Sequence, residues 1–190
     1  MTRSNEARAS TADLQPTLVG ELLELRPVEK DDYQALFAAA SDPLIWEQHP
    51  ENDRYTPEVF GRYFDGAIKS GGAFVIIERA SGRIIGSSRY HGFDPAAREV
   101  EIGWTFMERK FWGGVYNREL KDLMLRHAFK FVDRVLFIVG ENNLRSRKAV
   151  EKIGGKLVRT IERPDRNGKL EKNVVFGLDR SVWEKSLDER

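Results

Sequence analysis

Several features that mark common protein classes are missing from this sequence of 190 residues. It has no cysteine, which excludes disulfide bonds, thiolate metal sites and a cysteine nucleophile. No apolar run is long enough to cross a bilayer. Residues 1–16 are polar and lack the apolar core of a signal peptide. We therefore expect a cytoplasmic protein without a membrane partner.

An excess of charge of either sign is also missing. Lys and Arg number 31 and Asp and Glu number 30, which gives a formal net charge of +1. Without a basic field, no nucleic-acid partner is expected. No pair among the three histidines, His49, His91 and His127, has metal-ligand spacing, so no metal is expected. The glycine turns lack Gly-Lys-Ser/Thr and Gly-x-Gly-x-x-Gly, which disfavours ATP hydrolysis and dinucleotide binding.

The composition suits one domain with a sizeable core, since 41% of the residues are hydrophobic and 32% are charged. We place this domain at residues 17–190, after a flexible N-terminal arm at residues 1–16. Period-two patterns and turn signals predict strands at 18–26, 73–78, 83–93, 99–106, 134–140, 156–163 and 169–178. Helical periodicity and caps predict helices at 29–40, at 57–70, through 120–131 and within 141–155.

The order of these elements predicts an α+β fold with a mixed sheet. Strands 73–78, 83–93 and 99–106 form an antiparallel meander. A helix then crosses over to strand 134–140, which should run parallel to strand 99–106. Asn167-Gly168 signals a type I′ hairpin between the last two strands.

Residues 99–131 carry the strongest local signal for a binding site. Alternation places Val100, Ile102, Trp104 and Phe106 on one face of a strand. A basic, aromatic turn with two glycines follows, and then a helix. Unpaired N–H groups at the positive end of a helix are typical of an anion site, most often for phosphate. The alternative is an ordinary solvated turn before a helix.

Two motifs in this region and beyond it carry a resemblance to a known family. The first motif, Trp-Gly-x-Gly-Tyr-Ala-x-Glu, is matched by Trp112, Gly113, Tyr116 and Glu119. The second, Asn-x-x-Ser-x-(Arg/Lys)-x-x-Glu-Lys-x-Gly, is matched by Asn143, Ser146, Lys148, Glu151, Lys152 and Gly154. Over residues 18–180 the chain therefore resembles the GCN5-related N-acetyltransferases (GNAT), and within them the branch acting on ribosomal-protein N-termini. Because Val115 replaces the second glycine, any positive φ must come from Gly114.

The resemblance implies the GNAT fold and acetyl-CoA as cosubstrate. That fold has a central twisted mixed sheet of about seven strands with helices on both faces, in which two parallel strands splay apart to admit pantetheine. The pyrophosphate would lie on the glycine turn, with Arg109 and Lys110 adding charge. The residues implied in cofactor binding are Thr105, Phe106, Met107, Lys110, Gly113, Gly114, Val115, Tyr116, Asn117, Asn143, Ser146 and Lys148. Asn143 is alternatively only a helix N-cap.

Catalysis by this family would require a neutral amine, although an α-amine has a pKa of about 8 and a lysine of about 10.4. We expect Glu101 to act as general base, with Glu99 as the alternative on the same face. The competing interpretation is a strand glutamate paired with Arg89 or Arg98 across the hairpin. The tyrosine that many members use as general acid is absent, since that position holds Ala149 or Val150. Ser146 is the substitute, and Tyr116 a weaker one.

The acceptor side is least defined by the sequence. Trp46, His49 and His91 are candidates for substrate contact, although single histidines are more often structural, and we expect His127 to be packed. The acidic residues Glu47, Glu51 and Asp53 fit a cationic acceptor or a solvated loop equally.

The expected function is acetyl-CoA-dependent N-acetylation of a primary amine, on a small molecule or a protein N-terminus, by direct attack on the thioester. A homodimer is possible by analogy with related proteins. One alternative is a catalytically inactive CoA-binding sensor or assembly module. Another is a fold in which the glycine turn is only a turn.

Overall fold

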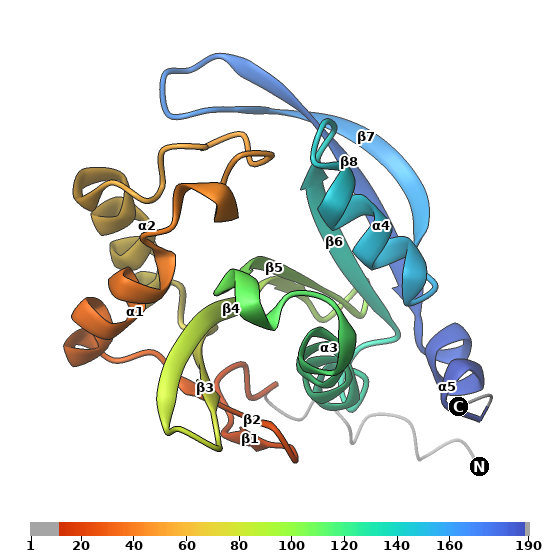
Figure 1. The fold of residues 1–190 in the computed structure, drawn as a ribbon. Helices are drawn as coiled ribbons and strands as arrows, with labels where there is room; N and C mark the ends of the chain where they lie inside the picture. Colours follow the sequence, from red (N-terminus) through yellow and green to blue (C-terminus); the bar gives the residue numbers. More distant parts are fainter. Residues whose placement is uncertain (1–11, 189–190) are drawn as a thin grey trace, which may run out of the picture.

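The computed structural model describes residues 12–188, which form one mixed sheet of eight strands with helices around it (Figure 1). The strand order is β1-β2-β3-β4-β5-β6-β8-β7, and only the β5–β6 pair is parallel. The strands are β1 (Leu18–Val19), β2 (Leu23–Pro27), β3 (Ala73–Glu78), β4 (Arg83–Asp94), β5 (Glu99–Met107), β6 (Arg134–Gly140), β7 (Lys156–Pro164) and β8 (Leu170–Asp179). The mixed α+β fold is thus confirmed.

The helices follow their sequence signals closely. They are α1 (Tyr33–Ala40), α2 (Pro57–Ser70), α3 (Gly114–Ala128), α4 (Leu144–Lys152) and α5 (Arg180–Asp188), with 3₁₀ turns at Lys30–Asp32, Pro43–Ile45 and Arg109–Phe111. Helix α2 begins with proline in its first turn and ends at Gly71 with φ of 64°. Helix α5 was not predicted from the sequence. None of the helices within residues 12–188 is long and apolar enough to span a membrane.

The eighth strand arises because the predicted strand 18–26 is two strands. The chain turns at residues 20–22, and the N–H of Gly20 donates to the carbonyl of Leu23 at 2.8 Å. The carboxylate of Glu119 on α3 accepts bonds from the N–H groups of Glu21, Leu22 and Leu23 at 2.7 to 2.9 Å. Glu119, a residue of the first motif, therefore anchors α3 to this turn.

The predicted N-terminal arm, residues 1–16, lies mostly outside the described residues. Its described part is bound to the domain, because the Gln15 side chain donates to the carbonyl of Ala73 at 3.0 Å. A ring nitrogen of His127 lies 2.7 Å from the carbonyl oxygen of Asp13, and this ring also packs against Tyr90 and Phe131. The end of the predicted arm, at Asp13 and Gln15, therefore contacts the domain.

The core has two parts, and β5 contributes to both. Val100 and Ile102 pack in the first part, which includes α3, whereas Phe106 packs in the second, with α1 and α2. The prediction that Val100, Ile102, Trp104 and Phe106 share one face is therefore wrong. A bulge explains the switch, because Arg89 pairs with Gly103 and Ser87 with Phe106, and Trp104 has φ of 51°.

Strands β5 and β6 separate after a short paired stretch. They pair only at Glu99–Arg134, Val100–Val135 and Glu101–Leu136, although both continue in the same direction. Beyond that point β5 pairs with β4, and β6 pairs with β8. The predicted splayed pair of parallel strands is confirmed, and it opens a gap in the centre of the sheet.

The final hairpin, β7–β8, arches toward the segment 44–56 that joins α1 and α2 (Figure 1). Its turn is not type I′, because Asn167 does not have the positive φ that this turn requires and only Gly168 does, at 80°. The Asp165 carboxylate instead accepts bonds from the N–H groups of Asn167 and Lys169, each at 2.8 Å. This turn directs Arg166 onto Asp53.

Candidate functional site

A cleft of about 670 Å³ runs from the start of α3 through the gap between β5 and β6 to segment 44–56. Eleven of the predicted site residues line it: Trp46, His49, Thr105, Phe106, Met107, Gly113, Gly114, Asn117, Asn143, Ser146 and Lys148. Five others do not line it: Glu101, His91, Lys110, Val115 and Tyr116. The two sequence motifs therefore meet across one cavity.

The start of α3 offers an open backbone surface. Gly113 and Gly114 have φ of 68° and 54°, and a Cβ atom built on either would meet nothing within 4 Å. Val115 keeps a negative φ and is exposed, so the inference that Gly114 must supply the positive φ is confirmed. The first N–H groups of a helix have no partner within it, and here no side chain caps them. This arrangement suits a bound phosphate.

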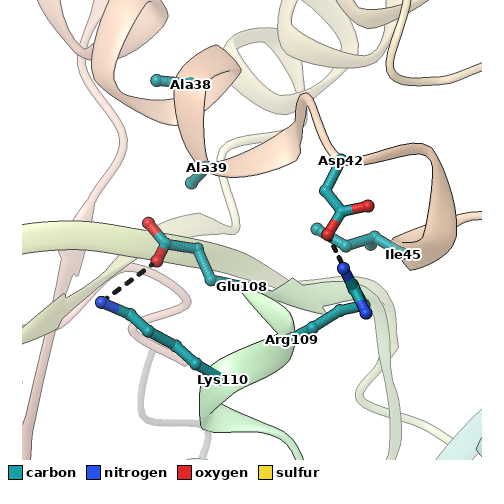
Figure 2. Close-up of a pocket in the computed structure, with 7 residues that line it drawn as sticks. All are labelled: Ala38, Ala39, Asp42, Ile45, Glu108, Arg109 and Lys110. Carbon is teal, nitrogen blue, oxygen red and sulfur yellow. Dashed lines mark hydrogen bonds and ion pairs between the residues drawn. The ribbon is translucent and has the colours of Figure 1, made fainter.

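The basic residues before α3 lie in a neighbouring hollow instead (Figure 2). Arg109 donates to the carboxylate of Asp42, and Lys110 lies 3.6 Å from the carboxylate of Glu108. The Tyr116 hydroxyl donates to Glu78 at 3.2 Å, away from the cleft. The side chains of Lys110 and Tyr116 are thus engaged elsewhere, and the basic side chains that line the cleft are those of Arg54, Arg118, Lys121, Arg145, Lys148 and Lys152.

At the opposite wall of the cleft, the start of α4 is capped by Asn143. Its side-chain oxygen accepts the N–H of Ser146 at 3.1 Å, and the residue is 6% exposed. The predicted N-cap role of Asn143 is confirmed. Because the cap uses the main chain of Ser146, the hydroxyl of that residue is left for other contacts. Ala149 lines the same wall.

Glu101 lies on β5 just before the strands part, with its carboxylate over Gly103. A Cβ atom on Gly103 would lie 3.1 Å from Oε1 of Glu101, so the missing side chain makes room for the carboxylate beside the cleft. Glu101 is 7% exposed, and burial raises its pKa to about 7 although Arg163 and Arg89 act against this. A carboxyl group that titrates near neutrality is suited to proton exchange with an amine.

The sequence left two alternatives to Glu101 as general base: an ion pair of Glu101 across the hairpin, and Glu99 as the base. Its neighbour across the hairpin is His91, while Arg98 binds Asp133, so pairing with Arg89 or Arg98 across the strands is not observed. Its ion pair is with Arg163 of β7, at 3.8 Å. Glu99 lies at the closed end of the gap, 3.6 Å from Arg134. The geometry therefore favours Glu101 over Glu99.

His91 and Trp104 form an aromatic contact beside Glu101. Their ring centroids are 4.9 Å apart, and His91 is exposed. The guanidinium of Arg89 lies 4.7 Å from the centroid of the Trp104 ring. Partial burial and the charges of Arg89 and Arg163 lower the pKa of His91, which favours its neutral form.

The sequence interpretation missed Lys121 of α3, which also lines the cleft. It is 8% exposed, makes no ion pair within residues 12–188, and its ammonium lies 5.2 Å from the centroid of the Phe137 ring. Burial lowers its pKa to about 8. Gly114, Asn117 and Lys121 share one helix face at i, i+3 and i+7, and this spacing is the signal that would have found it.

Lys121→Met is expected to stabilise the ligand-free protein at pH 7, by up to about 3 kcal/mol, because it removes a desolvated ammonium. The pKa of Lys121 falls from 10.5 to about 8 on folding. The loss of folding free energy caused by this buried ammonium is therefore complete below pH 8 and disappears as pH rises toward 10.5. Urea unfolding at pH 7 and pH 9.5 should show a smaller gain at the higher pH. The exposed Lys69 gives the control, Lys69→Met, with little change. An equal gain at both pH values would contradict this account.

Comparisons with known proteins agree with this arrangement. A family model described as an acetyltransferase (GNAT) domain matches residues 23–156, and no curated protein matches the sequence. A GCN5-related N-acetyltransferase from Brucella melitensis is 23% identical with a TM-score of 0.79, covering 90% of this chain and 81% of that one. A GNAT-family acetyltransferase from Bacillus anthracis is 22% identical with a TM-score of 0.70, covering 87% and 99%. Mycobacterium smegmatis RimJ, in complex with CoA-disulfide, is 19% identical with a TM-score of 0.66, covering 92% and 94%.

Proposed function

The chain belongs to the acetyltransferase (GNAT) family, whose members use acetyl-CoA, and we propose that it acetylates a primary amine. The acceptor would be a small molecule or a protein N-terminus that attacks the thioester directly. One observation carries the proposal. The gap that opens after Glu101 and Leu136 lies beside the uncapped glycine start of α3, in one continuous cleft.

The cleft residues fit the parts of acetyl-CoA. The N–H groups from Gly113 to Asn117 are proposed to hold the pyrophosphate, because the open glycines let its oxygens approach the main chain. The main chain of residues 105–107, on the free edge of β5, is proposed to bind pantetheine as an added strand. A main-chain N–H there would polarise the thioester carbonyl. Asn143 and Lys148 line the remaining wall.

The reacting groups are proposed to be Glu101 and Ser146. Acetyl-CoA supplies the acetyl thioester. As the amine nitrogen bonds to the carbonyl carbon, its proton passes to the Glu101 carboxylate directly or through water. The carbon–sulfur bond then breaks, and the Ser146 hydroxyl or water protonates the departing thiolate. Proton exchange with water then returns Glu101 to the carboxylate and Ser146 to the hydroxyl.

Ser146→Ala is expected to lower kcat by about tenfold, which is less than general acid catalysis usually contributes, because a thiolate leaves readily. The KM for acetyl-CoA should stay within about twofold, since the Asn143 cap uses a main-chain N–H that alanine keeps. Asn143→Ala is the matched variant, expected to cost about 1 kcal/mol of stability through loss of the cap. Steady-state kinetics with urea unfolding separate the two effects. An unchanged kcat in Ser146→Ala would leave Ser146 without a role in catalysis.

The proposed function is tested by calorimetric titration with acetyl-CoA, followed by free-thiol release over a panel of amines. We expect binding and turnover. Binding without turnover on any amine would support the second candidate, an inactive CoA-binding module. That candidate is favoured by Ala149 and Val150, which both line the cleft, because one of them holds the position of the tyrosine acid of many relatives. The homodimer, the cytoplasmic location and the absence of nucleic-acid, membrane and metal partners stay predictions from the sequence.

A further inference from the structure

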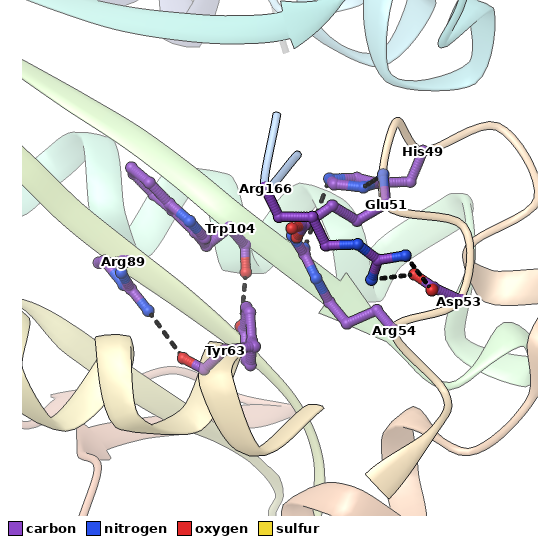
Figure 3. A network of polar contacts seen from close by, with 8 residues as sticks. All are labelled: His49, Glu51, Asp53, Arg54, Tyr63, Arg89, Trp104 and Arg166. Carbon is purple, nitrogen blue, oxygen red and sulfur yellow. Dashed lines mark hydrogen bonds and ion pairs between the residues drawn. The ribbon is translucent and has the colours of Figure 1, made fainter. Parts of the chain in front are cut away.

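Two acidic residues at the acceptor end of the cleft, Glu51 and Asp53, are already paired with arginines (Figure 3). Glu51 accepts a bond from Arg54, and Asp53 binds both terminal nitrogens of Arg166 at the hairpin tip. Glu47 lies 3.9 Å from Arg145. In the sequence, these three acidic residues were compatible with a cationic acceptor. In the structure each has a cation of the chain beside it, so none is left to recognise a second positive charge on the acceptor.

Two hydrogen-bond donors instead converge at this end of the cleft. Nδ1 of His49 accepts the N–H of Glu51 at 2.9 Å, so that nitrogen carries no proton. Burial and the charge of Arg54 lower the pKa of His49 to about 3, so the ring is neutral and its proton is on Nε2. Nη1 of Arg54 lies 3.4 Å from this Nε2. Two N–H donors thus face each other, no oxygen of residues 12–188 accepts from either, and both residues line the cleft.

The same region carries a buried excess of positive charge. Arg54 and Arg89 are 5% and 6% exposed, and Nε of each is buried without a partner within the described residues. Both guanidinium groups pack against the Tyr63 ring, at 4.9 and 5.8 Å from its centroid. Glu51 offsets Arg54, whereas Arg89 has no carboxylate of residues 12–188 within 4 Å and feels the charge of Glu101 only from a greater distance. Buried charges are normally paired, so this imbalance favours an anion.

We propose that the acceptor is an amine that also carries a carboxylate, and that His49 and Arg54 bind this carboxylate while the amine faces Glu101. The inference rests on the proposed function and names its substrate class. Arg54 Nη1 and His49 Nε2 supply the donors, Arg89 adds a long-range positive charge, and Trp46 and Trp104 form apolar walls.

A matched acceptor series tests this proposal. Glycine, β-alanine, 4-aminobutyrate and 6-aminohexanoate are each compared with their carboxamides, which keep the amine and lose the charge. A carboxamide also imitates a protein N-terminus, whose α-amine has an amide beside it. With saturating acetyl-CoA and free-thiol detection, kcat/KM for at least one acid should exceed that for its amide by about tenfold, as expected for a charge-assisted hydrogen bond.

Variants of Arg54 test whether the preference for acids over amides depends on this side chain. In Arg54→Gln the acid-to-amide ratio should fall to about 1, and in Arg54→Lys, which keeps the charge, it should fall less. The control is Arg62→Gln, an exposed arginine of α2 that pairs with Glu58, which should keep the wild-type ratio. Titration with acetyl-CoA verifies that each variant is folded. Arg54→Lys keeps the test decisive if Arg54→Gln does not fold.

The outcomes separate the two proposals. Acetylation of amides as efficiently as acids across the series would overturn the carboxylate site and leave N-acetylation intact. A preference for acids that survives both Arg54 variants would also overturn it. Absence of acetyl-CoA binding would overturn the proposed function and this inference together.

Discussion

Gly113→Glu is expected to lower the affinity for acetyl-CoA by more than about 100-fold, which corresponds to about 2.7 kcal/mol. Two causes add. Gly113 has φ of 68° and ψ of −168°, a region that costs about 1–3 kcal/mol for a residue other than glycine, so the free variant loop is expected to relax into another conformation and binding would have to restore this one. In addition, the new carboxylate would enter the open space in front of the helix N–H groups. There it would repel and replace the pyrophosphate that we propose binds to them.

The control for this variant is Gly82→Glu in the turn between β3 and β4. Gly82 also has φ of 68°, and a Cβ atom there would also meet nothing within 4 Å. It does not line the cleft. Calorimetric titration should therefore show normal affinity for Gly82→Glu, and thermal unfolding should show that both variants fold. Normal affinity in Gly113→Glu would remove the phosphate cradle from the proposal.

The start of α3 shows which features a single sequence predicts well. The two glycines, the valine beside them and the helical periodicity that follows are all local signals. Each restricts the backbone over a few residues. The same holds for α2, which lies between the proline of its first turn and Gly71. The splayed strand pair was also expected, but from the family resemblance, because no local pattern states where two strands separate.

The features that were missed depend on contacts between distant residues. The bulge at Trp104 shifts the register of β5 against β4, and alternation alone cannot show an inserted residue. Asp53 and Arg166 are 113 positions apart, so the sequence left Asp53 available for a substrate, while the fold pairs it. Lys121 was not singled out from the sequence, and it is buried in the fold. Pairing and burial thus decide the chemistry of the acceptor end.

Glu101→Gln is expected to lower kcat/KM by about 100-fold above pH 8, the smaller end of the range for removal of a general base. Burial raises the pKa of Glu101 from 4.5 to about 7. The carboxyl group is therefore protonated and inactive as a base below pH 7, and ionised above it. Because the acceptor amine titrates as well, the informative quantity is the ratio of wild-type to variant rates. This ratio should rise with pH up to about 7 and then level off.

The same pKa shift makes a prediction about stability that does not depend on the reaction. The unfolded carboxyl group ionises above pH 4.5 while the folded one keeps its proton to about pH 7. The stability from this proton is complete below pH 4.5 and is lost as pH rises through 7, so Glu101→Gln should be more stable than wild type above pH 7, by up to about 3 kcal/mol.

Glu99→Gln, at the closed end of the gap, is the matched control for the kinetic prediction and should change kcat/KM by less than about threefold. A rate ratio independent of pH, or a larger loss in Glu99→Gln, would transfer the role of base away from Glu101.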